Sequence, residues 1–210
     1  MASVGGFAYT VAEFNTIITM LGCLCATVQA ATGYHAAYRK KKIGLLKSND
    51  VLFRSHRAFG GFATTLYFLG LFAGLTGFIG AIFFDVPPFE SESPSFNIHV
   101  WPSFAVMVVV IWKTYISYFK KKSVYKKGKW LGMATFMAWA FTWISSAFSY
   151  YIRTTPANPQ HPPPRYLMPI ELLWLQILWP FLWGAIIGLI LIHYAEKLER
   201  KKASHITKAS

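Results

Sequence analysis

Residues 168–193 read MPIELLWLQILWPFLWGAIIGLILIH and contain one charged side chain, that of Glu171. A helix rises 1.5 Å per residue, so about 20 apolar residues cross the ~30 Å hydrocarbon layer of a bilayer. This stretch is therefore predicted to be a transmembrane helix. Four more apolar stretches of similar length precede it, at 9–32, 58–84, 99–119 and 130–151. A membrane β-barrel would instead show short segments of alternating polarity. The sequence predicts an all-α fold, a polytopic membrane helix bundle of about five transmembrane helices, with residues 1–210 as a single domain.

The overall composition agrees with a membrane protein. Hydrophobic residues make up 54% of the 210 residues and charged residues 14%, whereas about a quarter of a soluble domain is charged. The formal net charge of +13 would suggest nucleic acid if the chain were soluble. The position of that charge along the chain gives a different explanation.

The basic residues gather between alternate spans. The segments 39–57, 113–129 and 197–208 hold seven, seven and five Lys and Arg, which is 19 of the 21 in the chain. Cytoplasmic loops of membrane proteins carry such an excess. We therefore expect the N-terminus outside, the C-terminus in the cytoplasm, and a multi-pass location in a plasma or energy-transducing membrane. We expect the chain to contact the lipid bilayer and not to bind nucleic acid.

Four histidines lie at the ends of the predicted spans. His35, His56 and His193 are expected at the inner surface and His99 at the outer one. Two imidazoles from different helices at one depth can hold the iron of haem b. We therefore take His56 and His35 as candidate iron ligands at the inner surface and His193 as a further cofactor-binding candidate there. His99, which opens the third span, is a separate candidate iron ligand at the outer surface. The alternative is that these histidines simply lie at the membrane interface and bind no cofactor.

The helix that follows His56 has a smooth face. At 100° per residue, His56 shares this face with Gly60, Ala63, Gly70 and Gly74, among which Tyr67 is the one bulky side chain. Small residues in this spacing allow a second helix to approach closely, and they equally leave room for a flat porphyrin. Gly74 is therefore a cofactor-binding candidate.

Arginine next to His56 fits a haem site as well. Arg57 is a candidate partner for a haem propionate, because a guanidinium binds a carboxylate through two hydrogen bonds. The alternative is that Arg57 belongs to the positive charge that orients the chain in the membrane.

Three short stretches carry a resemblance: RSHRAFGGF at 54–62, GLFAGLTGFIG at 70–80 and IHVWPSF at 98–104. They resemble the haem-bearing membrane proteins of the cytochrome b561-like type over the second and third spans. The resemblance implies a four-helix haem core, transmembrane electron transfer, and His56 and His99 as ligands. Many helices of that type carry two histidines about four turns apart. No helix of this sequence does, so a single inner haem is expected.

We therefore expect a b-type cytochrome-like subunit that carries electrons to or from quinone or a partner subunit. The alternative is a haem-free accessory subunit of a larger membrane complex. A self-contained enzyme is disfavoured, because neither C-x-x-C nor H-E-x-x-H occurs. The expected protein partners are other subunits of a membrane complex or a second copy.

Cys23 and Cys25 lie within the first span and are expected to be buried free thiols.

Overall fold

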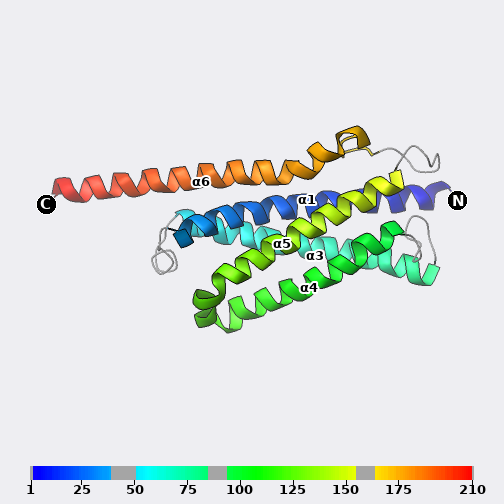
Figure 1. Ribbon diagram of the computed structural model, residues 1–210, viewed down its shortest axis with the longest axis horizontal. Helices are drawn as coiled ribbons and strands as arrows, with labels where there is room; N and C mark the ends of the chain where they lie inside the picture. The colour runs from blue at the N-terminus through cyan, green and yellow to red at the C-terminus, as the bar shows by residue number, and fades with distance from the viewer. Residues whose placement is uncertain (1, 39–50, 85–93, 155–163, 210) are drawn as a thin grey trace.

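The computed structural model describes residues 2–38, 51–84, 94–154 and 164–209, and these fold into long helices (Figure 1). The helices are α1 (Ala2–Tyr38), α3 (Val51–Ile79), α4 (Pro94–Phe119), α5 (Lys121–Thr154) and α6 (Leu173–Ala209). A π-helical turn, η1 (Gly80–Phe84), extends α3, and a 3-10 turn, η2 (Ile170–Leu172), precedes α6.

Five of the described helical stretches are long and apolar enough to cross a membrane. They are Val11–Tyr38, Val51–Phe84, Phe96–Phe119, Lys127–Ile152 and Ile170–Lys201. The predicted all-α bundle of five membrane-spanning helices, and hence an integral multi-pass protein in contact with the bilayer, is confirmed. Several helices run beyond the predicted spans, because Lys, Arg and Glu are good helix formers and do not end a helix where it leaves the apolar layer. The orientation in the membrane stays a prediction.

Consecutive helices run antiparallel, so their termini gather at two opposite ends of the bundle (Figure 1). We call one the basic end, where Arg54, Lys120 and Arg200 lie. The other is the proline end, where Pro94 begins α4 and Pro169 precedes η2. At the basic end α6 extends well beyond the other helices (Figure 1).

Helix α1 is the centre of the bundle. It packs along α3, α5 and α6, while α4 packs mainly on α5 and touches α3 very little. The threonines that α1 buries donate hydrogen bonds to its own backbone: Thr16 to Ala12 at 2.9 Å and Thr27 to Cys23 at 2.8 Å. Their hydroxyl groups are thereby satisfied away from water, as a lipid-embedded helix requires.

Two glycines of α6 allow it to approach α1 closely. A Cβ atom on Gly184 would lie 2.9 Å from the carbonyl oxygen of Leu24 and 2.6 Å from Cβ of Thr27. A Cβ atom on Gly188 would lie 2.8 Å from that of Ala31. Gly184 and Gly188 therefore form a small-xxx-small contact of the kind that drives helix association in membranes.

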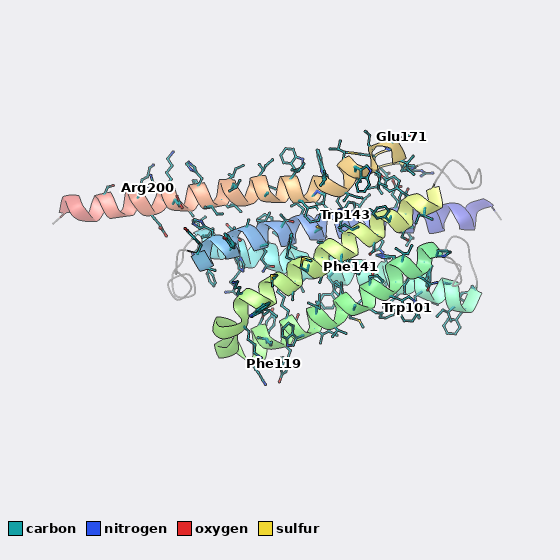
Figure 2. The ribbon with its side chains drawn as sticks, in the orientation of Figure 1. Trp101, Phe119, Phe141, Trp143, Glu171 and Arg200 are labelled. Atoms are coloured by element: carbon teal, nitrogen blue, oxygen red, sulfur yellow. The ribbon has the colours of Figure 1, made fainter. Side chains whose placement is uncertain are left out.

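The core between α1, α5 and α6 is built around Trp143. Its side chain is fully buried and its indole N–H donates to the carbonyl of Ile177 at 3.0 Å. Figure 2 shows Trp143 inside the bundle, while Trp101 and Phe119 lie at the exposed surface of α4. Cys23 packs in the same core. Cys23 and Cys25 are both buried and free, so the prediction for these thiols is confirmed.

A buried carboxylate joins the start of α6 to α1. Glu13 is 4% exposed, and its Oε1 accepts hydrogen bonds from the backbone N–H groups of Arg165, Tyr166 and Leu167 at 2.8, 2.8 and 3.2 Å. Gln176 adds a bond from the N–H of Met168 at 3.0 Å. These contacts fix the segment that precedes η2 against the first helix.

Candidate functional site: a groove between α3 and α4

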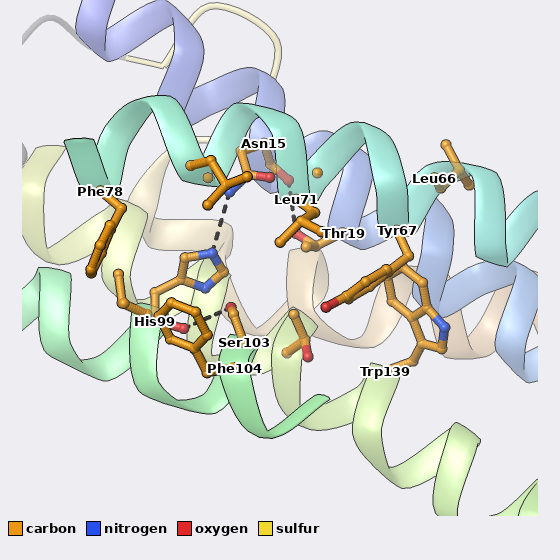
Figure 3. A pocket seen from close by; sticks show the side chains of 15 residues that line it. Asn15, Thr19, Leu66, Tyr67, Leu71, Phe78, His99, Ser103, Phe104 and Trp139 are labelled. Carbon is orange, nitrogen blue, oxygen red and sulfur yellow. Dashed lines mark hydrogen bonds between the residues drawn. The ribbon is translucent and has the colours of Figure 1, made fainter. Parts of the chain in front are cut away.

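A groove lies between α3 and α4, near the proline end (Figure 3). Its walls are α3 and α4, and Thr19 of α1 and Thr142 of α5 lie at its floor. The groove has a volume of about 70 Å³. The groove is partly open at the surface of two helices that are long and apolar enough to cross a membrane, so its mouth is expected to face lipid. The groove is thus a mostly apolar cavity with access from the bilayer.

One polar wall of the groove is formed by His99 of α4. The side-chain amide of Asn15 on α1 donates to Nε2 of His99 at 3.3 Å (Figure 3). This bond connects α1 to α4, two helices that otherwise have little contact. Ser103, one turn further along α4, donates to the carbonyl of His99 at 2.7 Å and also lines the groove. The amide of Asn15 therefore orients the imidazole within the candidate membrane span of α4.

Tyr67 of α3 provides the opposite polar group. The residue is 8% exposed, and the edge of its ring meets Trp139 of α5 with 6.1 Å between ring centroids. Its hydroxyl points into the cavity (Figure 3) and has no hydrogen-bond partner among the described residues. The side-chain amide oxygen of Asn15 likewise has no hydrogen-bond partner among the described residues. Buried polar atoms are nearly always paired, and an unpaired one costs about 1–3 kcal/mol. Two unsatisfied polar atoms in one cavity indicate a site for a polar ligand group.

The remaining walls are smooth or aromatic. The rings of Phe78 and Phe104 meet edge to face with centroids 5.8 Å apart at one end of the groove. On α3, a Cβ atom on Gly74 would meet no atom within 4 Å, so this glycine leaves open space rather than contacting another helix. Gly70 instead faces Asn15 of α1. Such walls accept a flat ring between a glycine surface and aromatic side chains.

A second, smaller cavity of about 40 Å³ adjoins the first. It shares Asn15, Gly74 and His99 with the first cavity and reaches Ser149 and Tyr150 of α5. The groove therefore continues toward the proline end, with His99 between its two parts.

The three histidines predicted at the inner surface of the membrane have different surroundings. Nε2 of His35 lies 3.3 Å from Oε1 of Glu196 on α6. Nδ1 of His56 lies 3.1 Å from Oγ1 of Thr32 on α1. His193 is exposed on α6. Within the described ranges no group of three His, Cys, Asp or Glu side chains could hold a metal ion.

The other sequence candidates divide between the groove and the surface. Gly74 and His99 both line the groove. Arg57 is exposed and its guanidinium lies over the ring of Phe53, 5.6 Å from the centroid. No second imidazole lines the groove opposite His99. The groove therefore lacks a pair of imidazoles that could hold haem iron between them, and haem binding by this chain stays a prediction.

Comparisons of the chain with protein-family models, curated proteins and solved structures give no match. Its function must therefore be inferred from the site itself.

The sequence did not identify Tyr67, Asn15 and Trp139 as site residues. A signal was present for Asn15, because an amide within an apolar span is uncommon and often functional. Tyr67 stood out as the one large side chain on the glycine face of α3. Nothing local in the sequence indicates that its hydroxyl lacks a partner, since this depends on α4 and α5.

Proposed function

We propose that this protein is a quinone-binding subunit of membrane electron transfer, with the groove between α3 and α4 as the site of the quinone ring. The unpaired hydroxyl of Tyr67, buried in an apolar cavity that opens to the bilayer, carries the proposal. A lipid-soluble quinone has a flat ring and two carbonyl oxygens that accept hydrogen bonds. Its isoprenoid tail would leave through the mouth of the groove into the lipid.

The polar groups of the groove suit both redox states. A quinone oxygen accepts from the Tyr67 hydroxyl, and the second oxygen lies toward His99. A quinol hydroxyl can instead donate to the amide oxygen of Asn15, which has no partner among the described residues. Reduction of a quinone takes up two electrons and two protons. Imidazole is suited to exchange such protons near neutral pH. We assign the electrons to a partner subunit in the same membrane.

Binding of a short-tailed ubiquinone analogue by the purified protein in lipid nanodiscs tests the proposal. Quinones quench tryptophan fluorescence, and Trp139 lies in the groove, so a titration reports the affinity. In Tyr67→Phe we expect the affinity to fall about five- to tenfold, which corresponds to one hydrogen bond of ~1 kcal/mol. The stability of this variant should be equal to or above that of the wild type, because an unpaired hydroxyl is removed.

Tyr115→Phe is the matched control, since Tyr115 is exposed on α4 outside the groove. Equal affinities in Tyr67→Phe, Tyr115→Phe and the wild type would exclude Tyr67 from the site. Trp139→Phe should remove the main part of the quenching; unchanged quenching would place the quinone elsewhere.

The same preparation tests the haem b expected from the sequence. A sharp α-band in the dithionite-reduced visible spectrum that is lost in His56→Ala would support it. A colourless, folded protein that binds quinone would instead favour the haem-free accessory subunit as the form in which this chain takes part in electron transfer.

A further inference from the structure

A second polar cluster lies between α3 and α4, at the basic end. Lys113 of α4 donates from Nζ to Oε1 of Gln29 on α1 at 3.2 Å. On α3, the ring of His56 lies against Gly33 and Thr32 of α1, about one helical turn from Gln29. The cluster thus brings one cation, one amide and one imidazole together from three helices.

Gln29 owes its position to a glycine on α3. A Cβ atom on Gly60 would lie 2.4 Å from the Nε2 atom of Gln29. The bare backbone at Gly60 therefore lets the amide lie flat on α3 and turn its oxygen toward Lys113. The contact is built from both helices and is not a chance meeting of long surface side chains.

The charge of Lys113 is not balanced by the residues around it. Gln29 is its one hydrogen-bond partner in the described part of the chain, and no described carboxylate pairs with it. An ammonium group has three N–H donors, so two remain for a ligand. A charge within a membrane span is costly unless it is paired. An anionic ligand would pair with the charge of Lys113.

The surroundings indicate where that anion comes from. Lys113 is half-buried, so part of its side chain is accessible from outside the bundle. Trp112 and Tyr115 on the same helix are exposed to the lipid. Arg54 and Arg57 are exposed at the same end of α3 and raise the local positive potential. Basic sites between transmembrane helices are typical binding places for anionic lipid headgroups.

We propose that Lys113, with Gln29 and His56 beside it, binds the phosphate group of an anionic phospholipid at the basic end of the α3–α4 interface. The acyl chains would lie along the exposed aromatic side chains of α4. This site is separate from the quinone groove. Lys113 and Gln29 each lie 14 residues further along α4 and α1 than His99 and Asn15, or about 21 Å at 1.5 Å per residue.

The test compares nanodiscs of phosphatidylcholine alone with nanodiscs that also contain phosphatidylglycerol. Native mass spectrometry counts the lipid that stays bound, and the thermal midpoint reports its effect on stability. We expect phosphatidylglycerol to be retained and to raise the midpoint of the wild type. Lys113→Gln should lower the retention about fivefold, which corresponds to the ~1 kcal/mol that one Lys contributes near an anionic membrane surface.

Lys120→Gln is the matched control, because Lys120 is an exposed cation at the end of α4 whose amine lies over the ring of Tyr115. It should bind as the wild type does. Lys113→Arg keeps the charge and should retain lipid, and this variant still decides the question if Lys113→Gln fails to fold. Equal retention in Lys113→Gln and Lys120→Gln, loss of retention in Lys113→Arg, or the same rise in midpoint with inorganic phosphate in detergent would each overturn the lipid site.

Discussion

The contact of Glu13 with the start of α6 gives a stability prediction that can be worked out from the structure. Its Oε1 accepts three backbone N–H groups, and of these the bond from Leu167 is fully buried while those from Arg165 and Tyr166 are partly open. Hydrogen bonds to a charged group contribute about 1.5–3 kcal/mol each, but three on one oxygen are not additive. Leaving the buried N–H of Leu167 unpaired adds about 1–3 kcal/mol.

Glu13→Ala should therefore lower the free energy of unfolding by about 3 kcal/mol. Glu13→Gln keeps an acceptor oxygen but loses the charge. A neutral hydrogen bond is roughly half as strong as a charge-assisted one, so the expected loss is about 1–2 kcal/mol. Titration of the protein in mixed micelles with a denaturing detergent, followed by circular dichroism, measures both values.

Glu171→Gln is the control for these variants. Glu171 is exposed at the same end of the bundle, so its replacement should stay within about 0.5 kcal/mol of the wild type. If Glu13→Gln and Glu171→Gln were equally stable, or if Ala and Gln at position 13 gave the same loss, the charge of Glu13 would not be what holds this segment.

Three further predictions use the same unfolding assay. Gly184→Ala should lose about 1–3 kcal/mol, because the new methyl group would lie 2.9 Å from the backbone oxygen of Leu24, whereas Gly61→Ala, with no atom within 4 Å, should lose nothing. Trp143→Phe should lose about 2–3 kcal/mol through the smaller side chain and the lost bond from its indole N–H, and a loss below 0.5 kcal/mol would contradict its place in the core. Gly74→Leu should keep the stability of the wild type and abolish binding of the short-tailed quinone, since it fills the groove; retained binding would refute the site.

The membrane helices could be predicted from the sequence because their signal is local. Any window within 168–193 shows the length and polarity that a bilayer requires, without reference to the rest of the chain. The helix ends were less well predicted. Apolar length marks the membrane boundary, while α5 begins before it and α6 continues beyond it in segments rich in Lys, and in α6 also Glu and Arg.

The site was predicted in part, for a related reason. His99 and Gly74 are visible as a polar and a small residue in apolar surroundings, and both line the groove. The depth of a histidine along its helix follows from the sequence, but the direction in which it points relative to other helices does not. His35 and His56 lie at the same end and yet bind α6 and α1 respectively.

The glycine pairs illustrate the same limit. Gly70–Gly74 and Gly184–Gly188 have identical spacing, but in the second pair both glycines contact another helix while Gly74 faces open space. Which pair brings two helices together depends on how α1 is surrounded, and that is decided by contacts between distant parts of the chain.

The central place of α1 has a consequence for the making of the protein. Helix α1 is synthesised before α6 but completes its contacts only with that later segment, since Glu13 accepts hydrogen bonds from the backbone at 165–167 and Thr27 packs against Gly184. Until α6 is inserted, the carboxylate of Glu13 and the face of α1 that carries Thr27 lack the contacts that this later segment provides. The packing of α1 is therefore completed only when α6 has entered the membrane.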